Sequence, residues 1–133
     1  MKPLTLTSLH HVSALTAQAA NNLDFYRQAL GLRLVKKTVN QDDTSSYHLF
    51  YGDERGNPGT EVTFFDIPFA APTRPGVGSI SRIALRVTGS ESLAWWQERF
   101  ETLGIEHDPL TTEDGRAVLA FRDLEGNSIL RRP

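Results

Sequence analysis

Cysteine is absent from the 133 residues of this sequence. This absence excludes disulfide bonds, thiolate nucleophiles and cysteine-based zinc sites, and it leaves histidine and carboxylate side chains as the available metal ligands. A surplus of positive charge is also absent, because the net charge is -2 at pH 7, so we expect no nucleic-acid partner. There is no long apolar run and no secretory leader, which predicts a cytoplasmic protein with no membrane partner.

The sequence does contain one pattern of elements twice, at an offset of about 70 residues. Each copy has a strand pattern, an amphipathic helix with an aromatic pair that is expected to pack in the core, and further strand patterns. The first helix is expected from an N-cap at Asn21 or Asn22 to Leu30, and the second over Ser90–Leu103. Gly31 and Gly104 stand where each helix is expected to stop. Repetition of this kind predicts an α+β fold made of two tandem βαβββ modules.

The strand patterns and one flexible segment set the expected boundaries of the modules. Alternating or apolar runs predict strands at Leu9–Leu15, Leu32–Val39, Ser46–Tyr51, Thr60–Ile67, Ile80–Thr88, Ile105–Leu110, Arg116–Arg122 and Ser128–Arg132. Module 1 then covers residues 1–68, a linker rich in proline and glycine covers residues 69–78, and module 2 covers residues 79–133. A chain of this length normally holds one core, so both modules are expected to form a single domain, residues 1–133.

Histidine supplies the candidate reactive groups, at His10, His11 and His48. Imidazole is a common neutral ligand of zinc, iron, copper and nickel, and a histidine on a strand can aim its nitrogen at a site on the sheet face. Strand alternation places His11 and Ser13 on one face and His10 on the other, so only one of the two adjacent histidines is expected to bind a metal directly. On the residues alone, a purely structural histidine pair is favoured over a metal site.

Three runs of sequence carry a resemblance to a known family. They are Leu9-His10-His11-Val12-Ser13, Phe25-Tyr26 followed by residues 30–40, and Tyr47-His48-Leu49-Phe50-Tyr51-Gly52-Asp53 followed by residues 56–60. Together they resemble the opening of the ring-cleaving dioxygenases that act on hydroquinones. These enzymes belong to the vicinal oxygen chelate superfamily, which also contains glyoxalases and is built from paired βαβββ modules. The resemblance covers essentially the whole chain, but the family's usual protein looks like two such two-module domains in series.

The resemblance implies an Fe(II) site held by two histidines and one carboxylate, with His11 as the ligand that this chain supplies. It places His10 beside the ligand as a group that handles a substrate proton, and Ser13 in the same pocket, while it assigns His48 no ligand role. Where related modules carry further ligands, this sequence has Thr63, Arg82 and Leu130. The implied substrate is a small aromatic, hydroquinone-like molecule, and the chain alone is expected to be inactive because its metal site is incomplete.

Three hypotheses follow for the whole protein. In the first, the chain is the N-terminal half of a dioxygenase and pairs with a second two-module domain that completes the iron site. In the second, it is a stand-alone protein of the glyoxalase and bleomycin-resistance type, which binds a small aromatic ligand without metal or uses another ligand set such as His11, His48 and Glu61. In the third, it is a non-catalytic partner subunit. Exposed sheet edges favour a homodimer where no second domain covers them.

Overall fold

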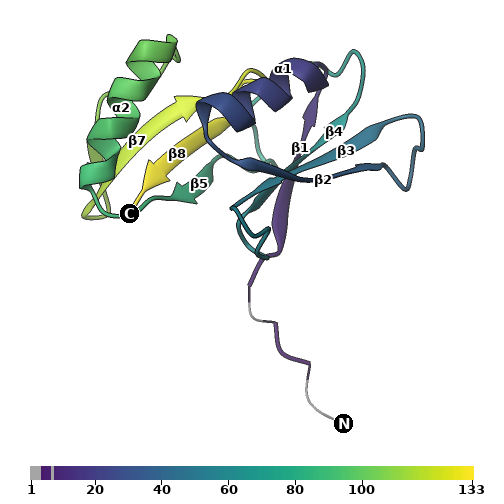
Figure 1. Ribbon diagram of the computed structural model, residues 1–133, viewed down its shortest axis with the longest axis horizontal. Coiled ribbons are helices and arrows are strands. Elements are labelled where there is room, and N and C mark those ends of the chain that lie inside the picture. Colours follow the sequence, from purple (N-terminus) through teal and green to yellow (C-terminus); the bar gives the residue numbers. More distant parts are fainter. Residues whose placement is uncertain (1–3, 7) are drawn as a thin grey trace. The chain divides into compact units, whose positions relative to one another are not determined.

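The computed structural model describes residues 4–6 and 8–133 and divides the chain into two compact units, Met1–Ala70 and Ala71–Pro133 (Figure 1). Each unit holds a four-stranded sheet and a helical segment. The predicted α+β class and the duplicated βαβββ module are therefore confirmed. The boundary between the units falls inside the expected linker, residues 69–78. Within the described part of the chain, no helix is long and apolar enough to cross a membrane.

The first unit is built around one mixed sheet. Its elements are β1 (His11–Thr16), α1 (Ala19–Asp24), the π-helical turn η1 (Phe25–Ala29), β2 (Arg33–Val39), β3 (Tyr47–Gly52) and β4 (Glu61–Asp66). The strand order is β1-β4-β3-β2, in which β1 runs parallel to β4 and the other neighbours are antiparallel. The first and last strands of the unit therefore lie side by side at one edge of the sheet.

The first helical segment begins earlier than predicted. Its N-cap is Gln18, whereas Asn22, an expected cap, is buried within the helix. From Phe25 onward the winding becomes π-helical, and the N–H of Leu30 donates to the C=O of Phe25 at 3.1 Å. The predicted glycine stop is confirmed, because Gly31 has a φ of +70°, a conformation that side chains other than glycine rarely adopt.

Aromatic side chains fill the space between this helical segment and the sheet. Tyr26, Tyr51 and Phe64 are all 0% exposed. The Tyr26 ring stacks on Tyr51 with centroids 5.0 Å apart, and it lies 4.8 Å from the ring of Phe64. Phe50 and Thr63 are the neighbours of Tyr51 and Phe64 along their strands, so they lie on the opposite face. The helical segment therefore covers one face of the sheet, and the other face carries Phe50 and Thr63.

The second unit repeats the arrangement but departs from the prediction after α2. Its elements are β5 (Ile83–Arg86), α2 (Glu91–Leu103), β6 (Thr111–Glu113), β7 (Arg116–Arg122) and β8 (Ser128–Arg132), with the strand order β5-β8-β7-β6. The expected stop at Gly104 is confirmed, with a φ of +66°. Residues 105–110, which are all described, form no strand and contain only a bridge from His107 to Phe121. Pro109 explains part of this difference, because proline has no N–H to donate to a sheet.

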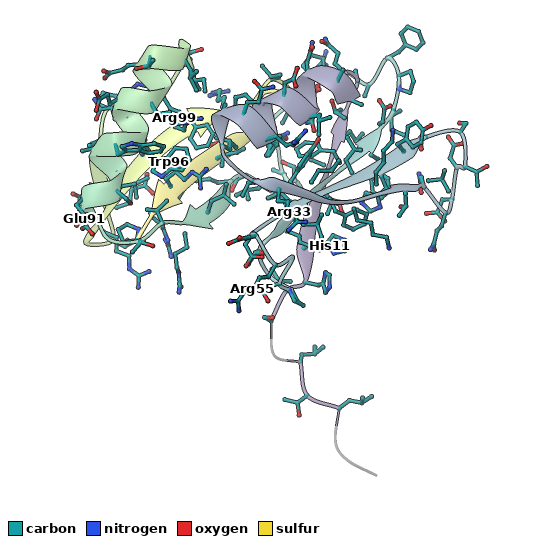
Figure 2. All side chains as sticks on the ribbon, in the orientation of Figure 1. His11, Arg33, Arg55, Glu91, Trp96 and Arg99 are labelled. Atoms are coloured by element: carbon teal, nitrogen blue, oxygen red, sulfur yellow. The ribbon has the colours of Figure 1, made fainter. Side chains whose placement is uncertain are left out.

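The aromatic pair on α2 packs only in part. Trp96 lies on the inner side of α2 as labelled in Figure 2. Its ring centroid lies 5.7 Å from that of Phe100, and the guanidinium of Arg131 lies 3.9 Å from the centroid of the Trp96 ring. Trp95 is 54% exposed, so the expectation that both rings pack in the core is wrong for this residue. One step along a helix rotates a side chain by about 100°, which turns Trp95 away from the sheet that Trp96 faces.

Candidate functional site

The candidate site lies on the face of the first sheet opposite its helical segment. His11 and Ser13 alternate onto this face of β1. The parallel register places Glu61 of β4 next to His11, and Thr63 next to Ser13. We call this surface the histidine face. Its members from β1, β3 and β4 are His11, Ser13, His48, Phe50, Glu61, Thr63 and Phe65.

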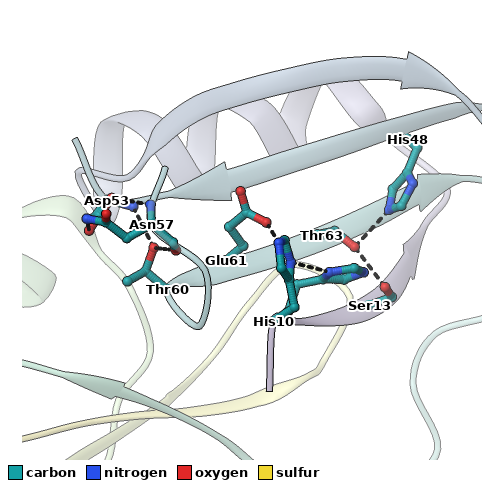
Figure 3. A network of polar contacts seen from close by, with 9 residues as sticks. His10, Ser13, His48, Asp53, Asn57, Thr60, Glu61 and Thr63 are labelled. Carbon is teal, nitrogen blue, oxygen red and sulfur yellow. Dashed lines mark hydrogen bonds and ion pairs between the residues drawn. The ribbon is translucent and has the colours of Figure 1, made fainter. Parts of the chain in front are cut away.

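The two adjacent histidines meet on this surface, although strand alternation predicts opposite faces for them. Nδ1 of His10 lies 3.0 Å from Nδ1 of His11, and the two rings are edge to face (Figure 3). The prediction of opposite faces is wrong because β1 begins at His11, so alternation does not direct the side chain of His10. The backbone N–H of Gly59 donates to the C=O of His10 at 2.6 Å and so ties this residue to the loop before β4.

The loop between β3 and β4 holds Gly59 in that position. The Asp53 carboxylate accepts hydrogen bonds from the backbone N–H and the side-chain amide of Asn57 (Figure 3). It also accepts one from the backbone N–H of Arg55. These bonds, those from Asn57 first, hold the pKa of Asp53 below its usual value. Gly59 has a φ of +87°, and a Cβ there would lie 3.2 Å from a backbone oxygen of the preceding segment. Only glycine therefore allows the loop to approach His10 this closely.

Glu61 brings a buried carboxyl group to the histidine pair. Its side chain is 7% exposed, and Oε2 lies 3.4 Å from Nδ1 of His10. No described residue gives Oε2 a hydrogen bond. Burial of a carboxylate oxygen is costly unless a cation or a charged partner accompanies it. Among the described residues, His10, His11 and Glu61 form the group of three whose metal-binding atoms all lie within 4.8 Å of one another.

These separations fit a metal ion in two ways. Atoms about 2.1 Å from one ion are about 3.0 Å apart at octahedral angles and about 3.4 Å apart at tetrahedral angles. The separations from Nδ1 of His10, 3.0 Å to His11 and 3.4 Å to Glu61, match these values, so His10 could bind an ion together with either of these residues. Alternatively, His11 binds the ion through Nε2 while His10 and Glu61 support its other side, because ligand histidines usually have their second nitrogen held by a partner.

A second set of hydrogen bonds crosses the histidine face. Thr63 is 0% exposed. Its hydroxyl oxygen lies 2.8 Å from Oγ of Ser13 and 2.8 Å from Nε2 of His48 (Figure 3). A hydroxyl can donate one hydrogen bond and accept others, so Thr63 links the serine to the imidazole. The structure thus places Ser13 on the same face as His11, as its position in the strand predicts.

His48 is held among aromatic rings. Its ring centroid lies 3.9 Å from that of Phe65 and 4.0 Å from that of Phe50, and 6.3 Å from that of His11. Burial lowers the pKa of His48, and the charges of His11 and Lys36 lower it further. The folded state therefore favours the neutral imidazole. The stability gained in this way is present above the unfolded pKa of about 6.5 and is lost as the pH falls through the lower folded value.

Replacement of Thr63 by valine is expected to lower the free energy of unfolding by about 1–2 kcal/mol, because Ser13 and His48 each lose a hydrogen-bond partner. The Thr63→Ser variant retains the hydroxyl and should recover most of this loss. Urea denaturation of both variants and the wild type measures the difference. Equal stability of Thr63→Val and the wild type would show that the hydroxyl does not contribute to holding the two groups together.

Two positions of the second unit, Arg82 and Leu130, were considered as places for a metal ligand, and neither side chain can bind a metal there. Arg82 precedes β5 and forms an ion pair with Glu113 at 2.7 Å. Leu130 lies in β8 and is 4% exposed, so it belongs to the core. These are two of the positions at which the family resemblance implies a ligand that this sequence lacks. In the described part of the chain, the candidate metal-binding group therefore belongs to the first unit alone.

The model of the Glyoxalase/Bleomycin resistance protein/Dioxygenase superfamily matches residues 8–130. The chain belongs to this superfamily. The match agrees with the two βαβββ modules, and it confirms the family resemblance that the sequence motifs carry.

Ring-cleaving dioxygenases are among the superfamily members similar to this chain. "Putative ring-cleaving dioxygenase MhqA" of Bacillus subtilis (strain 168) is 55% identical over 127 residues, which are 96% of this chain and 40% of MhqA. Chlorohydroquinone/hydroquinone 1,2-dioxygenase of Sphingobium indicum is 34% identical over 121 residues, 90% of this chain and 37% of that enzyme. The crystal structure of a "putative dioxygenase" from Bacillus subtilis matches with a TM-score of 0.88 and 34% identity, over 94% of this chain and 40% of that chain. The chain thus spans about 40% of the length of these relatives.

Thr63 and Glu61 make central contacts in the site that the sequence alone does not indicate. The sequence indicates Thr63 only as a residue that replaces a ligand, and Glu61 only as a member of an alternative ligand set. Both residues could be identified from the alternation of β4 together with its register against β1, which pairs residues 61 and 63 with residues 11 and 13. Strand alternation within each segment was visible in the sequence, but the pairing between these two segments was not.

Proposed function

We propose that this chain is the His11-bearing part of a ring-cleaving dioxygenase that acts on a hydroquinone-like ring. The proposal depends on the position of His11, whose Nδ1 is engaged by His10 and whose ring lies beside those of Phe50 and His48. A metal ligand next to flat aromatic groups suits a substrate that binds the metal through a ring oxygen and stacks on the protein. The similarity to MhqA and to the hydroquinone 1,2-dioxygenase supports this substrate class.

The proposed metal is Fe(II), which when bound supplies the redox chemistry for ring cleavage by dioxygen. His11 is the ligand from this chain. His10 accepts the proton of the substrate hydroxyl at Nε2, and the Glu61 carboxylate, 3.4 Å from Nδ1, stabilises the resulting imidazolium. Ser13 lines the same face and offers the substrate a hydroxyl whose direction is set by its bond to Thr63.

The two remaining ligands, a histidine and a carboxylate, are proposed to come from a second pair of modules. One imidazole does not hold Fe(II) against water, so this chain alone should not cleave rings. We propose that it pairs with a second two-module domain or, where none is present, with a second copy of itself. Leu15, which is 52% exposed, is an apolar side chain that such a partner would cover.

A self-contained metal site is the second candidate, and the separations of 3.0 and 3.4 Å around His10 favour it. His10, His11 and Glu61 provide the two-histidine, one-carboxylate set that suits non-haem iron. A set in which His48 replaces His10 has less support, because Nε2 of His48 lies at hydrogen-bond distance from Thr63. In this candidate the chain binds a small aromatic ligand as a stand-alone homodimer.

Iron retention separates these candidates. The chain is loaded anaerobically with Fe(II), alone and mixed with the part of MhqA that this chain does not match, and iron is counted after gel filtration. The proposal expects iron to be retained only by the mixture. Stoichiometric iron on the chain alone, lost in a Glu61→Gln variant, would contradict it and establish the self-contained site. No iron in either sample would indicate a non-catalytic partner subunit.

A further inference from the structure

Lys36 lies on β2, at the edge of the first sheet opposite β1, and contacts the ring of Phe50 on the histidine face. It pairs with Phe50 across β2 and β3, so its side chain shares the face of Phe50, and Nζ lies 5.8 Å from the centroid of that ring. Lys37, the next residue, pairs with Leu49 on the opposite face. Its Nζ lies 3.8 Å from the ring centroid of Tyr47. The two neighbouring lysines therefore place the same charge on opposite faces of one strand.

Phe50 lies between Lys36 and the candidate metal ligand. The ring centroids of Phe50 and His11 are 5.8 Å apart. The strand order β1-β4-β3-β2 places His11 and Lys36 on opposite edges of the sheet, and three strand spacings separate their backbones by about 14 Å. Both side chains nevertheless approach the same phenylalanine ring. An aromatic ring resting on Phe50 would thus have an imidazole toward one end and an ammonium toward the other.

The charge of Lys36 is available to a ligand. Among the described residues, no carboxylate forms an ion pair with Lys36. The attraction of an exposed ammonium to an aromatic ring is weaker than a hydrogen bond between charged groups, so an anion could draw Lys36 away from Phe50.

We infer that Lys36 recognises a negatively charged substituent at the end of the substrate ring remote from the oxygen held at His11. The inference rests on the proposed function, because it requires the ring to lie on the histidine face. It narrows the substrate class to hydroquinone-like rings that also carry an anionic group, such as a carboxylate, at the end of the ring that faces Lys36.

A lysine on an edge strand also has a simpler role, because its charge discourages pairing with another sheet. Lys37 can serve this role equally well. It lies on the same edge strand, carries the same charge and faces away from Phe50, so it is the matched control for Lys36.

The experiment uses two probes of similar shape that differ in charge, 4-hydroxybenzoate and the neutral 4-hydroxybenzamide. Dissociation constants are measured by NMR titration at low salt for the wild type and for Lys36→Met, Lys36→Arg and Lys37→Met. We expect the wild type to bind the carboxylate about 2–5-fold more tightly than the amide, as for a partly exposed charge pair. The Lys36→Met variant should lose this preference, whereas Lys36→Arg and Lys37→Met should keep it.

The outcomes separate this inference from the proposed function. A preference that survives in Lys36→Met, or that falls equally in Lys37→Met, overturns the inference. The proposed function stands in that case, provided both probes still shift the ring resonances of Phe50 and His48. If neither probe shifts these resonances, the ring does not bind the histidine face, and both the inference and the proposed mode of substrate binding are overturned. The iron experiment tests the metal site independently of either result.

Discussion

Alanine at position 11 is expected to abolish iron retention and ring cleavage by the assembled dioxygenase. His11 is the ligand that we assign to this chain, and the loss of one of three ligands removes a large share of the metal-binding free energy. The effect should exceed the change of about 10–100-fold that is usual when a residue supporting a ligand is replaced. Iron content after gel filtration and oxygen consumption with a hydroquinone measure both losses.

The His10→Ala variant is the matched control, because the two imidazoles are adjacent and their Nδ1 atoms lie 3.0 Å apart. It should retain iron and turn over about 10–100-fold more slowly, since His10 is proposed to handle a proton and to support the ligand. Loss of iron from His10→Ala with retention by His11→Ala would mean that the roles are reversed. Equal loss from both variants and from Glu61→Gln would instead indicate that all three residues bind the ion.

Local signals in the sequence predict most elements of the fold. The glycine stops at Gly31 and Gly104 and the strands Arg116–Arg122 and Ser128–Arg132 agree with the structure, because turn chemistry and alternation act over a few residues. The π-helical turn at Phe25–Ala29 was not predictable in this way. Its amphipathic spacing resembles that of an ordinary helix, and packing of the aromatic residues against the sheet accompanies the changed winding.

The candidate site was less predictable because contacts between distant segments form it. The sequence identifies His11 and Ser13 as members of one face, and that much follows from alternation. The parallel pairing of β1 with β4 then places Glu61 and Thr63 beside them, at a separation in sequence of 50 residues between Ser13 and Thr63. The direction of His10 depends on where β1 begins, and element boundaries are the least certain part of a sequence-based prediction.

The buried aromatic cluster on the other face of the same strands is expected to be the largest local source of stability in the first unit. Phe64 is 0% exposed and lies against Tyr26 and Tyr51, so Phe64→Ala should lower the free energy of unfolding by about 3–5 kcal/mol. This loss is a large fraction of the stability of about 5–15 kcal/mol that is typical of a domain. Urea denaturation measures it.

The Tyr51→Phe variant is the control for that substitution, because it keeps the ring and removes only a hydroxyl. This hydroxyl is buried and has no hydrogen bond from the described residues, and burial raises the pKa of Tyr51. Its removal should leave stability unchanged or raise it by up to about 1 kcal/mol. A loss of less than about 1 kcal/mol in Phe64→Ala would contradict the role of the cluster. Because Phe64 and Thr63 are neighbours on β4, loosening of the cluster should also broaden the NMR signals of His48, which Thr63 holds from the opposite face.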